Sequence, residues 1–151
     1  MTSTVHGTAL LIGATGVLIR GPSGSGKSRL ALALIDRGAR LVADDRVFVS
    51  HCHGRLVAGP PAATAGLLEV RGRGLVTLPF ERWAVLRLLV DLVEPRVLER
   101  LPEAPELSEE LCGVRLARQP VAIGDALAHL LVEMAARAAH GRPGAWPLHS
   151  P

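Results

Sequence analysis

The sequence predicts an α/β fold of the P-loop kinase type: a single compact domain whose mixed central sheet carries flanking helices and extra hairpins. The first observation is the phosphate-binding pattern G-x-x-x-x-G-K-[ST] at residues 21–28, between the apolar run 16–20 and a helical pattern. The second is another helical pattern near the C-terminus, and the third is a series of short apolar runs separated by Gly and Pro. A chain of 151 residues buries about two-thirds of its unfolded surface, enough for a real core.

The first half is expected to begin with two paired strands and the helix that follows the motif. Residues 8–12 and 17–20 read as a β-hairpin or as two adjacent strands, because a turn sequence separates them. A helix over 27–37 ends at Gly38, a residue suited to the position after a helix. Next come a short strand at 40–43, closed by Asp44-Asp45, and a hairpin of 46–50 with 55–58.

The second half is expected to hold more strands and one helix. After a loop at 59–66, strand-like pieces follow at 67–71 and 75–78, and 83–93 is most simply a buried strand, with a helix left open. Residues 95–110, rich in Glu and Pro, read as an exposed excursion. A helix over 125–140 is expected, with the tail 141–151 flexible beyond a domain of 1–140. The apolar positions that predict this helix are Leu127, Leu130, Leu131, Met134 and Ala138.

Composition limits the classes to which the protein can belong. Its two cysteines, Cys52 and Cys112, with no basic and then apolar leader, indicate reduced thiols and a soluble, cytoplasmic protein. The longest apolar run, 84–93, is interrupted by Arg87 and Asp91 and has about half the length of a membrane span. The net charge is +3, but scattered arginines and the absence of Tyr argue against nucleic acid. The positive charge is compatible with an acidic protein partner.

The motif at 21–28 has the chemistry of phosphate binding. Its glycines let backbone N–H groups converge on phosphate oxygens, and the following helix presents its positive end to the same anion. Lys27, the only lysine among 17 basic residues, is expected to neutralise the β- and γ-phosphates, and the Ser28 hydroxyl to ligate Mg²⁺. A Gly/Ser-rich turn that matches by chance is the alternative. The expected nucleotide-binding residues are Gly21, Pro22, Ser23, Gly24, Ser25, Gly26, Lys27 and Ser28.

Asp44 and Asp45 follow the strand after the motif helix, at the sheet edge where open α/β folds bind ligands. Phosphoryl transfer needs a group that positions or deprotonates the attacking oxygen. Since neighbouring residues on a strand point in opposite directions, one of the two is expected to face the γ-phosphate. A turn-forming or capping pair is the alternative. Asp91 is the rival carboxylate, ranked second because the apolar residues 92 and 93 continue its strand.

Two further groups of residues suggest chemistry less strongly. Glu69 and Arg71 share one strand face, which would suit a metal contact and a phosphate contact, although such a pair is more often a solvated face. The triplet 51–53, His-Cys-His, invites a zinc site, but no remote spacing supplies the remaining ligands, so a hairpin tip is expected. His6, just before the first expected strand, has no role that its spacing assigns.

Together these residues resemble the catalytic domain of HPr kinase/phosphorylase, the bifunctional enzyme that acts on a serine of the phosphocarrier protein HPr. The resemblance covers roughly half the chain, counted as motif-bearing segments in order. The phosphate loop is generic, whereas the Asp-Asp pair and the E-x-R-G-x-G signature at 69–74 make the match specific. The matching segments are His6-Gly7-Thr8, residues 21–28, Leu41-Val42-Ala43-Asp44-Asp45 and residues 66–74.

The resemblance implies an ATP- and Mg²⁺-dependent protein-serine kinase with an HPr-like protein as its substrate and a regulatory role in a phosphotransferase system. Asp44 would be the general base in the kinase direction. In phosphorolysis, protonated Asp44 would return a proton to the serine oxygen while inorganic phosphate attacks and pyrophosphate forms. Asp45 would support Asp44.

The resemblance also implies roles around the phosphates and an assembly. Glu69 and Ser28 would hold Mg²⁺, Arg71 would assist at the phosphate, and His6 would lie close to the active site. The chain would form a homo-oligomer, a hexamer by the family's pattern.

The chain departs from the family pattern in two places and so resembles the shortened form found in some proteobacteria. It begins essentially at the catalytic domain, and residues 119–124 lack the family's Arg- and Pro-rich loop. Kinase activity is therefore expected more than phosphorylase activity. The alternatives are a small-molecule kinase and a nucleotide- or phosphate-sensing module without transfer. Such a module needs only the phosphate loop and a metal, so the presence of Asp44, Asp45 and Glu69 argues against it.

Overall fold

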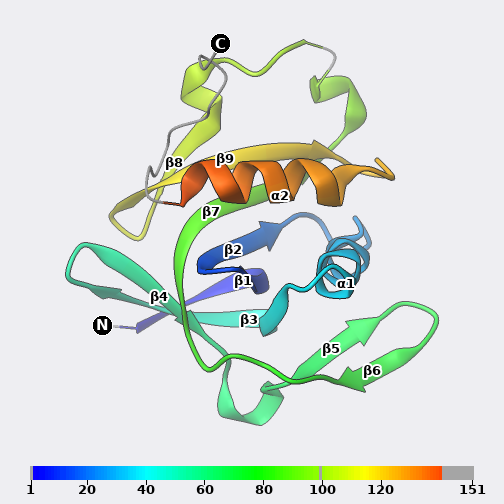
Figure 1. The fold of residues 1–151 in the computed structure, drawn as a ribbon, viewed down its shortest axis with the longest axis vertical. Coiled ribbons are helices and arrows are strands. Elements are labelled where there is room, and N and C mark those ends of the chain that lie inside the picture. Colours follow the sequence, from blue (N-terminus) through cyan, green and yellow to red (C-terminus); the bar gives the residue numbers. More distant parts are fainter. Residues whose placement is uncertain (1, 99, 141–151) are drawn as a thin grey trace.

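The computed structural model describes residues 2–98 and 100–140, and this part of the chain is a mixed α/β domain (Figure 1). Its helices are α1 (Lys27–Asp36) and α2 (Ala128–Ala139), with 3₁₀ turns at Ala62–Thr64, Pro95–Leu98 and Ala104–Leu107. Its strands are β1 (Thr2–Ile12), β2 (Thr15–Arg20), β3 (Arg40–Cys52), β4 (Arg55–Gly59), β5 (Leu67–Val70), β6 (Gly74–Thr77), β7 (Ala84–Val93), β8 (Ser108–Leu111) and β9 (Val114–Ala122). The expected α/β class, with a mixed sheet, flanking helices and extra hairpins, is confirmed.

The main sheet has seven strands in the order β2-β1-β3-β4-β7-β9-β8, and β7 also pairs with β2. Five of these strands, β1, β2, β7, β4 and β3, therefore pair in a closed cycle. The pairings β2–β7 and β7–β9 are parallel and the rest are antiparallel. β5 and β6 form a separate two-stranded sheet, which extends away from the main sheet below α1 (Figure 1).

Side chains alternate between two cores on the two faces of the main sheet. Along β2, Val17 and Ile19 join the core beneath the helices, and Leu18 joins the core inside the strand cycle. Both helices belong to the first core, in which α1 contributes Leu30 and Leu34. The helices α1 and α2 thus cover one face of the sheet. The other face is enclosed by the cycle of five strands, and its side chains form the second core. This arrangement places the start of α1 at the end of the parallel strands.

The helix after the motif ends as the sequence predicts. Arg37 is its C-cap, and Gly38 follows with φ of 107°. The amide of Ala39 donates to the Leu34 carbonyl and that of Gly38 to the Ile35 carbonyl, both at 3.0 Å. This is the Schellman arrangement, in which the residue after the C-cap, here Gly38, takes a left-handed conformation that favours glycine.

The first and third strands are longer than expected. β1 begins at Thr2, so His6 lies inside it, because residues 2–7 pair with residues 45–50 of β3. β3 runs without a break from Arg40 to Cys52, so Asp44 and Asp45 lie in mid-strand and do not close a short one. Pairing between segments almost forty residues apart in the chain provides the hydrogen bonds that local sequence does not reveal.

The region before the last helix also differs from expectation. The prediction of an exposed excursion over 95–110 is wrong at its end, because Ser108 begins β8. The sequence did not predict β9. Parallel pairing with β7 and antiparallel pairing with β8 extend the sheet there. Pro120 is accommodated in β9, opposite Asp91 of β7.

The last helix forms but presents a different face from the one predicted. Leu127, Leu130 and Met134 are 61%, 38% and 50% exposed. The buried residues of α2 are Ala128, Val132, Ala135, Ala136 and Ala139. Small side chains let α2 approach the sheet closely, so close packing has decided the orientation instead of the larger apolar surface of the leucines. The helix also starts at Ala128 and not at Asp125.

The other expected elements are confirmed. The β1–β2 and β3–β4 hairpins and the β5–β6 pair appear in the structure, and the strand expected at 83–93 is β7. The expected tail at 141–151 lies outside the described residues. No helix within 2–98 and 100–140 has the length and hydropathy to cross a membrane.

Candidate active site

The phosphate loop joins β2 to α1 and leaves the first amides of the helix without a side-chain cap. Gly24 (φ 78°) and Gly26 (φ 103°) take left-handed backbone angles, which disfavour any residue with a Cβ. Gly26 is the N-cap of α1 and no side chain caps the helix there. The helix start therefore offers backbone N–H groups and the positive end of its dipole to an anion.

Two side chains of the loop fit a phosphate group. The Lys27 Nζ donates to the carbonyl oxygens of Gly21, at 2.8 Å, and Pro22, at 3.1 Å, which holds the ammonium over the loop. The Ser25 hydroxyl is buried and has no hydrogen-bond partner among the described residues. A buried unpaired hydroxyl costs about 1–3 kcal/mol, and a phosphate oxygen in the loop is an acceptor that removes this cost.

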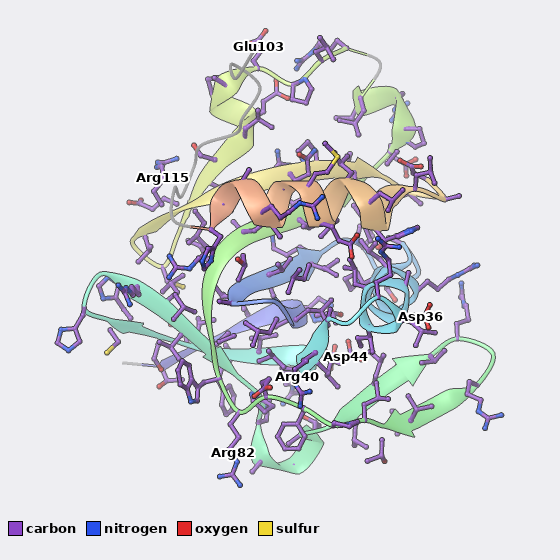
Figure 2. The ribbon with its side chains drawn as sticks, in the orientation of Figure 1. Asp36, Arg40, Asp44, Arg82, Glu103 and Arg115 are labelled. Carbon is purple, nitrogen blue, oxygen red and sulfur yellow. The ribbon has the colours of Figure 1, made fainter. Side chains whose placement is uncertain are left out.

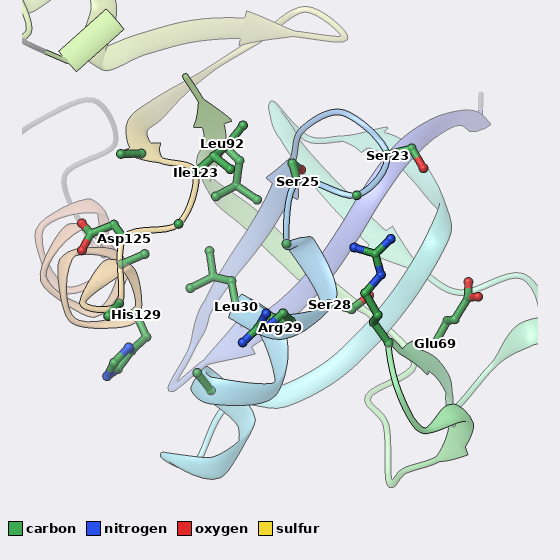
Figure 3. A pocket seen from close by; sticks show the side chains of 18 residues that line it. Ser23, Ser25, Ser28, Arg29, Leu30, Glu69, Leu92, Ile123, Asp125 and His129 are labelled. Atoms are coloured by element: carbon green, nitrogen blue, oxygen red, sulfur yellow. The ribbon is translucent and has the colours of Figure 1, made fainter. Parts of the chain in front are cut away.

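A cavity of about 670 Å³ lies beside the loop (Figure 3). It sits at the carboxyl ends of the parallel strands β2, β7 and β9, where open α/β sheets bind ligands. Loop residues and the start of α1 form one wall, the connection from β9 to α2 forms the second, and Glu69 and Arg71 form the third. Its size suits a small-molecule substrate.

The cavity wall divides the predicted nucleotide-binding residues into two groups. Gly21, Pro22 and Lys27 are not in the wall, and they are joined to one another by the lysine's hydrogen bonds. The loop residues that line the cavity are Ser23, Gly24, Ser25, Gly26 and Ser28. These five residues face the cavity, whereas the loop's own carbonyls hold the Lys27 ammonium outside the wall.

Asp44 is held in a fixed position beside the Glu69 wall. Its Oδ1 accepts a hydrogen bond from the Thr8 hydroxyl at 2.8 Å, and its Oδ2 accepts one from the Glu69 backbone N–H at 3.2 Å. Thr8 is fully buried, and Asp44 is half-buried. Figure 2 shows Asp44 between β3 and the β5–β6 hairpin. Each carboxylate oxygen keeps a lone pair for a further donor, so the group can accept a hydroxyl proton.

A β-bulge sets the direction of Asp44. The register between β1 and β3 shifts at Ala9 and Leu10, which face Ala43 and Leu41, so Val42 is the extra residue. Val42 and Ala43 both lie in the core inside the strand cycle, and Asp44 is turned toward the helix-covered side with Thr8. Bulges commonly redirect a side chain in this way beside a functional site.

Asp45 points elsewhere and pairs with His6. Its φ of 70° is left-handed, which is uncommon for a residue other than glycine. The His6 Nδ1 lies 3.2 Å from its Oδ1, and the two side chains are 63% and 71% exposed. Neither residue lines the cavity; Asp44 is also outside its wall but is joined to the wall through the Glu69 amide. The two aspartates therefore occupy different surroundings, as the strand alternation predicts.

Ser28 and Glu69 are the residues that fit a Mg²⁺ ion. Both line the cavity, one from the first turn of α1 and the other from β5. No group of three or more His, Cys, Asp or Glu residues gathers as a metal site in the described part of the chain. Mg²⁺ commonly takes one or two protein oxygen ligands together with substrate phosphates and waters, so this pair suits magnesium bound with a nucleotide.

Asp91, the rival carboxylate, is engaged in an ion-pair network away from the cavity wall. Arg20 binds both of its carboxylate oxygens at 2.8 Å, and Arg118 Nε lies 2.5 Å from its Oδ2. Burial alone raises the pKa of Asp91, but the hydrogen bonds from Arg20 and Arg118 outweigh it and hold the pKa below its usual value. Arg20 also binds Glu109 at 2.8 and 2.9 Å. Asp91 therefore ties strands together and does not face the ligand.

The triplet 51–53 lies at the tip of the β3–β4 hairpin, as expected. Cys52 is exposed and His53 takes a left-handed turn conformation with φ of 51°. None of these residues lines the cavity beside the phosphate loop.

Comparison with known proteins identifies the family of this site. The model of the HPr Serine kinase C-terminal domain matches residues 1–143. This chain belongs to that family. An HPr kinase/phosphorylase from Bordetella avium is 40% identical over 148 residues, which cover 90% of this chain and 48% of the relative. One from Clostridium tetani is 48% identical over 75 residues, 50% of this chain and 25% of the relative.

A solved structure supports the same family at the level of the fold. The Hpr(Ser) kinase/phosphatase from Coxiella burnetii superposes with a TM-score of 0.77 at 31% identity, over 89% of this chain and 94% of that one. The chain spans about half the length of the Bordetella relative. The resemblance to HPr kinase/phosphorylase and the α/β fold class that the sequence predicts are therefore confirmed.

The wall from β9 to α2 is the part of the HPr Serine kinase domain site that sequence reasoning missed. Ile123, Gly124, Asp125 and His129 line the cavity there, as does Arg29 from α1. The available signal was short: the apolar residues 121–123 lead directly into Gly124-Asp125, which is the pattern of a strand that stops at the ligand-binding edge of the sheet.

Proposed function

We propose that this chain binds ATP with Mg²⁺ and transfers the γ-phosphoryl group to a serine of an HPr-like phosphocarrier protein. The observation that carries the proposal is the Asp44 carboxylate, fixed by Thr8 and the Glu69 amide beside a phosphate loop and its cavity. A sensing module has no need of a carboxylate held at that place. The family match supports the choice of acceptor.

The residues would divide the work of the transfer among them. The loop amides, Lys27 and the Ser25 hydroxyl bind the phosphates, and Ser28 and Glu69 hold Mg²⁺, which neutralises charge on the phosphate oxygens when bound. Asp44 accepts the proton of the attacking serine hydroxyl. A bond forms between the serine oxygen and the γ-phosphorus while the bond from that phosphorus to the ADP oxygen breaks. Arg71, in the same wall as Glu69, balances charge on the transferred group.

The reverse reaction uses the same groups with inorganic phosphate as the nucleophile. A phosphate oxygen attacks the phosphorus of phosphoserine, the bond to the serine oxygen breaks, and protonated Asp44 donates its proton to that oxygen. Pyrophosphate and serine are the products. Asp45 and His6, paired on the exposed side of β1 and β3, support the position of this part of the strand. We propose assembly into a homo-oligomer, with a hexamer as the specific form.

Intact-mass measurement of an HPr-like protein tests the proposal in both directions. Incubation with this chain and MgATP is expected to add the mass of one phosphoryl group, and later excess inorganic phosphate to remove it with release of pyrophosphate. Mass that appears but is not removed would limit the proposal to the kinase direction. An unchanged mass despite measurable ATP binding would reject protein phosphorylation of this acceptor and favour the sensing module.

A further inference from the structure

Beyond Asp44, β1 and β3 continue together past the end of β2. β2 pairs with residues 8–12 of β1 only, whereas residues 2–7 of β1 pair with residues 45–50 of β3. Thr8 pairs with both Ile19 and Asp44, so this two-stranded extension begins at the level of the proposed base, close to where β2 ends and the phosphate loop starts. A protein that presents a hydroxyl to Asp44 therefore comes close to the extension.

One face of the extension is open to solvent. Val47 and Val49 belong to the core inside the strand cycle. Because Arg46 and Phe48 alternate with them along β3, they face away from that core. Arg46 is exposed, and Phe48 is 40% exposed. Phe48 is four residues beyond Asp44, about 13 Å along the strand.

The start of β7 adds a second aromatic residue to the same face. Gly59 of β4 pairs with Phe48, and the register of β4 with β7 places Gly59 opposite Trp83, directly before β7. A Cβ on Gly59 would lie 2.7 Å from the Arg82 carbonyl oxygen, so the chain before β7 is packed against Gly59. Ala84 lies in the core inside the strand cycle, so Trp83 faces away from it and is 65% exposed. Two exposed aromatic side chains thus flank a residue that has no side chain.

Arginines border the two aromatic residues. Arg46 precedes Phe48 on β3, and Arg55 of β4 faces the same side because Leu56 lies in the core inside the strand cycle. Both arginines are exposed, and neither forms an ion pair with a described residue. The chain has only two Phe and two Trp, and aromatic residues and arginine are enriched where proteins bind one another. A fitting partner carries carboxylates around an apolar side chain.

We propose that Arg46, Phe48, Arg55 and Trp83 form a docking face for the acceptor protein, which covers them while its serine reaches Asp44. This inference rests on the proposed function, since it takes the acceptor to be a protein. A specific interface buries about 800 Å² on each partner, a patch of about 16 Å radius, and so extends from Asp44 past Phe48. A second copy of this chain fits less well, because two identical docking faces would bring like charges together.

Two measurements on the full chain test the docking face: calorimetric titration with an HPr-like protein in the absence of ATP, and steady-state transfer from MgATP. Phe48→Thr, which keeps a residue suited to a strand, and Trp83→Ala should each weaken acceptor binding and raise the KM for the acceptor by about tenfold. The kcat at saturating acceptor and the dissociation constant of ATP should stay within about twofold of the wild-type values, because neither side chain touches the reacting groups.

Matched controls separate the docking face from the rest of the surface. Leu32 is also 40% exposed but lies on α1, so Leu32→Ala should bind and phosphorylate the acceptor as the wild type does. The double variant Arg46→Gln with Arg55→Gln should weaken acceptor binding by about fivefold at low salt and make it less dependent on salt. Arg115→Gln, at an exposed arginine of β9 (Figure 2), should change neither. Losses in the two controls as large as those in the docking variants would overturn the assignment.

The remaining outcomes separate this inference from the proposed function. An unchanged KM and dissociation constant for the acceptor in both aromatic variants would overturn the docking face, as would an equal loss of kcat or of ATP affinity. A change in sedimentation with unchanged acceptor binding would assign the face to a second copy and also overturn it. Weaker acceptor binding in the variants, without phosphoryl transfer by the wild type, would overturn the proposed function alone. Absence of both binding and transfer in the wild type would overturn both proposals.

Discussion

At the scale of single residues, the site depends on hydrogen bonds that fix Asp44. Its two oxygens are held from two separate elements, by the buried Thr8 hydroxyl of β1 and by the Glu69 amide of β5. A carboxylate held in this way needs little reorganisation to accept a proton from a docked hydroxyl, which is the advantage of a preorganised base. In the proposed transfer, Thr8 would therefore be a positioning residue that does not touch the substrate.

Replacement of Thr8 by Val tests this role. Val has nearly the same shape but lacks the hydroxyl, so Asp44 loses one of its two bonds, and the turnover number is expected to fall by about tenfold with little change in the affinity for ATP. Steady-state kinetics and ATP titration measure the two quantities. Thr8→Ser restores the donor and should recover most of the activity. Equal activity of the Val and wild-type proteins would show that Asp44 does not need the bond.

At the scale of elements, an ion-pair network ties together the strands that lead to the cavity. Arg20 of β2, Asp91 of β7, Glu109 of β8 and Arg118 of β9 are linked by side-chain contacts. The bonds from Arg20, foremost among the causes, hold the pKa of Glu109 below its usual value. Since Arg20 directly precedes the phosphate loop, this network anchors the strand from which the loop starts.

Asp91→Ala is expected to lower the free energy of unfolding by about 2–3 kcal/mol at neutral pH, because it leaves two arginines with one shared carboxylate. The pKa values of Asp91 and Glu109 are lowered by folding. Their stabilisation is therefore complete above the unfolded pKa values and is lost as the pH falls below about 4. The difference between wild type and variant should shrink in that range.

Urea denaturation at several pH values measures this difference. Glu110→Gln is the matched control, because Glu110 is an exposed carboxylate beside Glu109, and it should unfold as the wild type does. A difference between wild type and Asp91→Ala that stays constant from neutral to acid pH would contradict the electrostatic explanation.

The closeness of β2 and β7 gives a second prediction at this scale. A Cβ on Gly16 would lie 2.3 Å from the Val85 carbonyl oxygen, which belongs to the neighbouring backbone. Gly16→Ala must push the parallel strands apart and should cost about 2–3 kcal/mol in unfolding free energy. Gly13→Ala, in the adjacent turn where no atom lies within 4 Å, meets no clash and should cost only the strain of a left-handed residue at φ 60°, about 1 kcal/mol. Equal stability of both variants would contradict the close approach.

Elements set by local sequence were predictable, and those set by distant pairing were not. The motif and Gly38 fix α1 within a few residues, so its end was predicted. The full length of β1 and β3 depends on pairing across the molecule, and β9 depends on its parallel pairing with β7, which is not adjacent to it in sequence. The predicted buried face of α2 was wrong, because its alanines, and not the larger leucines, allow the helix to approach the sheet closely.

At the scale of the whole molecule, the closed cycle of strands brings distant parts of the chain to one cavity. The phosphate loop, Asp44 and Glu69 were predicted as candidates from their motifs, but no local pattern states that the Asp44 carboxylate meets the Glu69 amide. That contact needs the bulge at Val42 and the position of the β5–β6 hairpin. The wall from β9 to α2 was missed for the same reason, since its strand was not recognised.

Asp44 is the proposed base for phosphoryl transfer, and single-turnover transfer from MgATP to an HPr-like protein tests this role most directly. Asp44→Asn should lower the rate by about 10²–10⁴-fold with unchanged ATP affinity, because the amide keeps the shape but accepts no proton. Asp45→Asn, whose carboxylate pairs with the exposed His6 instead of bonding to Thr8 and the Glu69 amide, should lower it much less. A wild-type rate for Asp44→Asn, or an equal loss for both variants, would contradict the account.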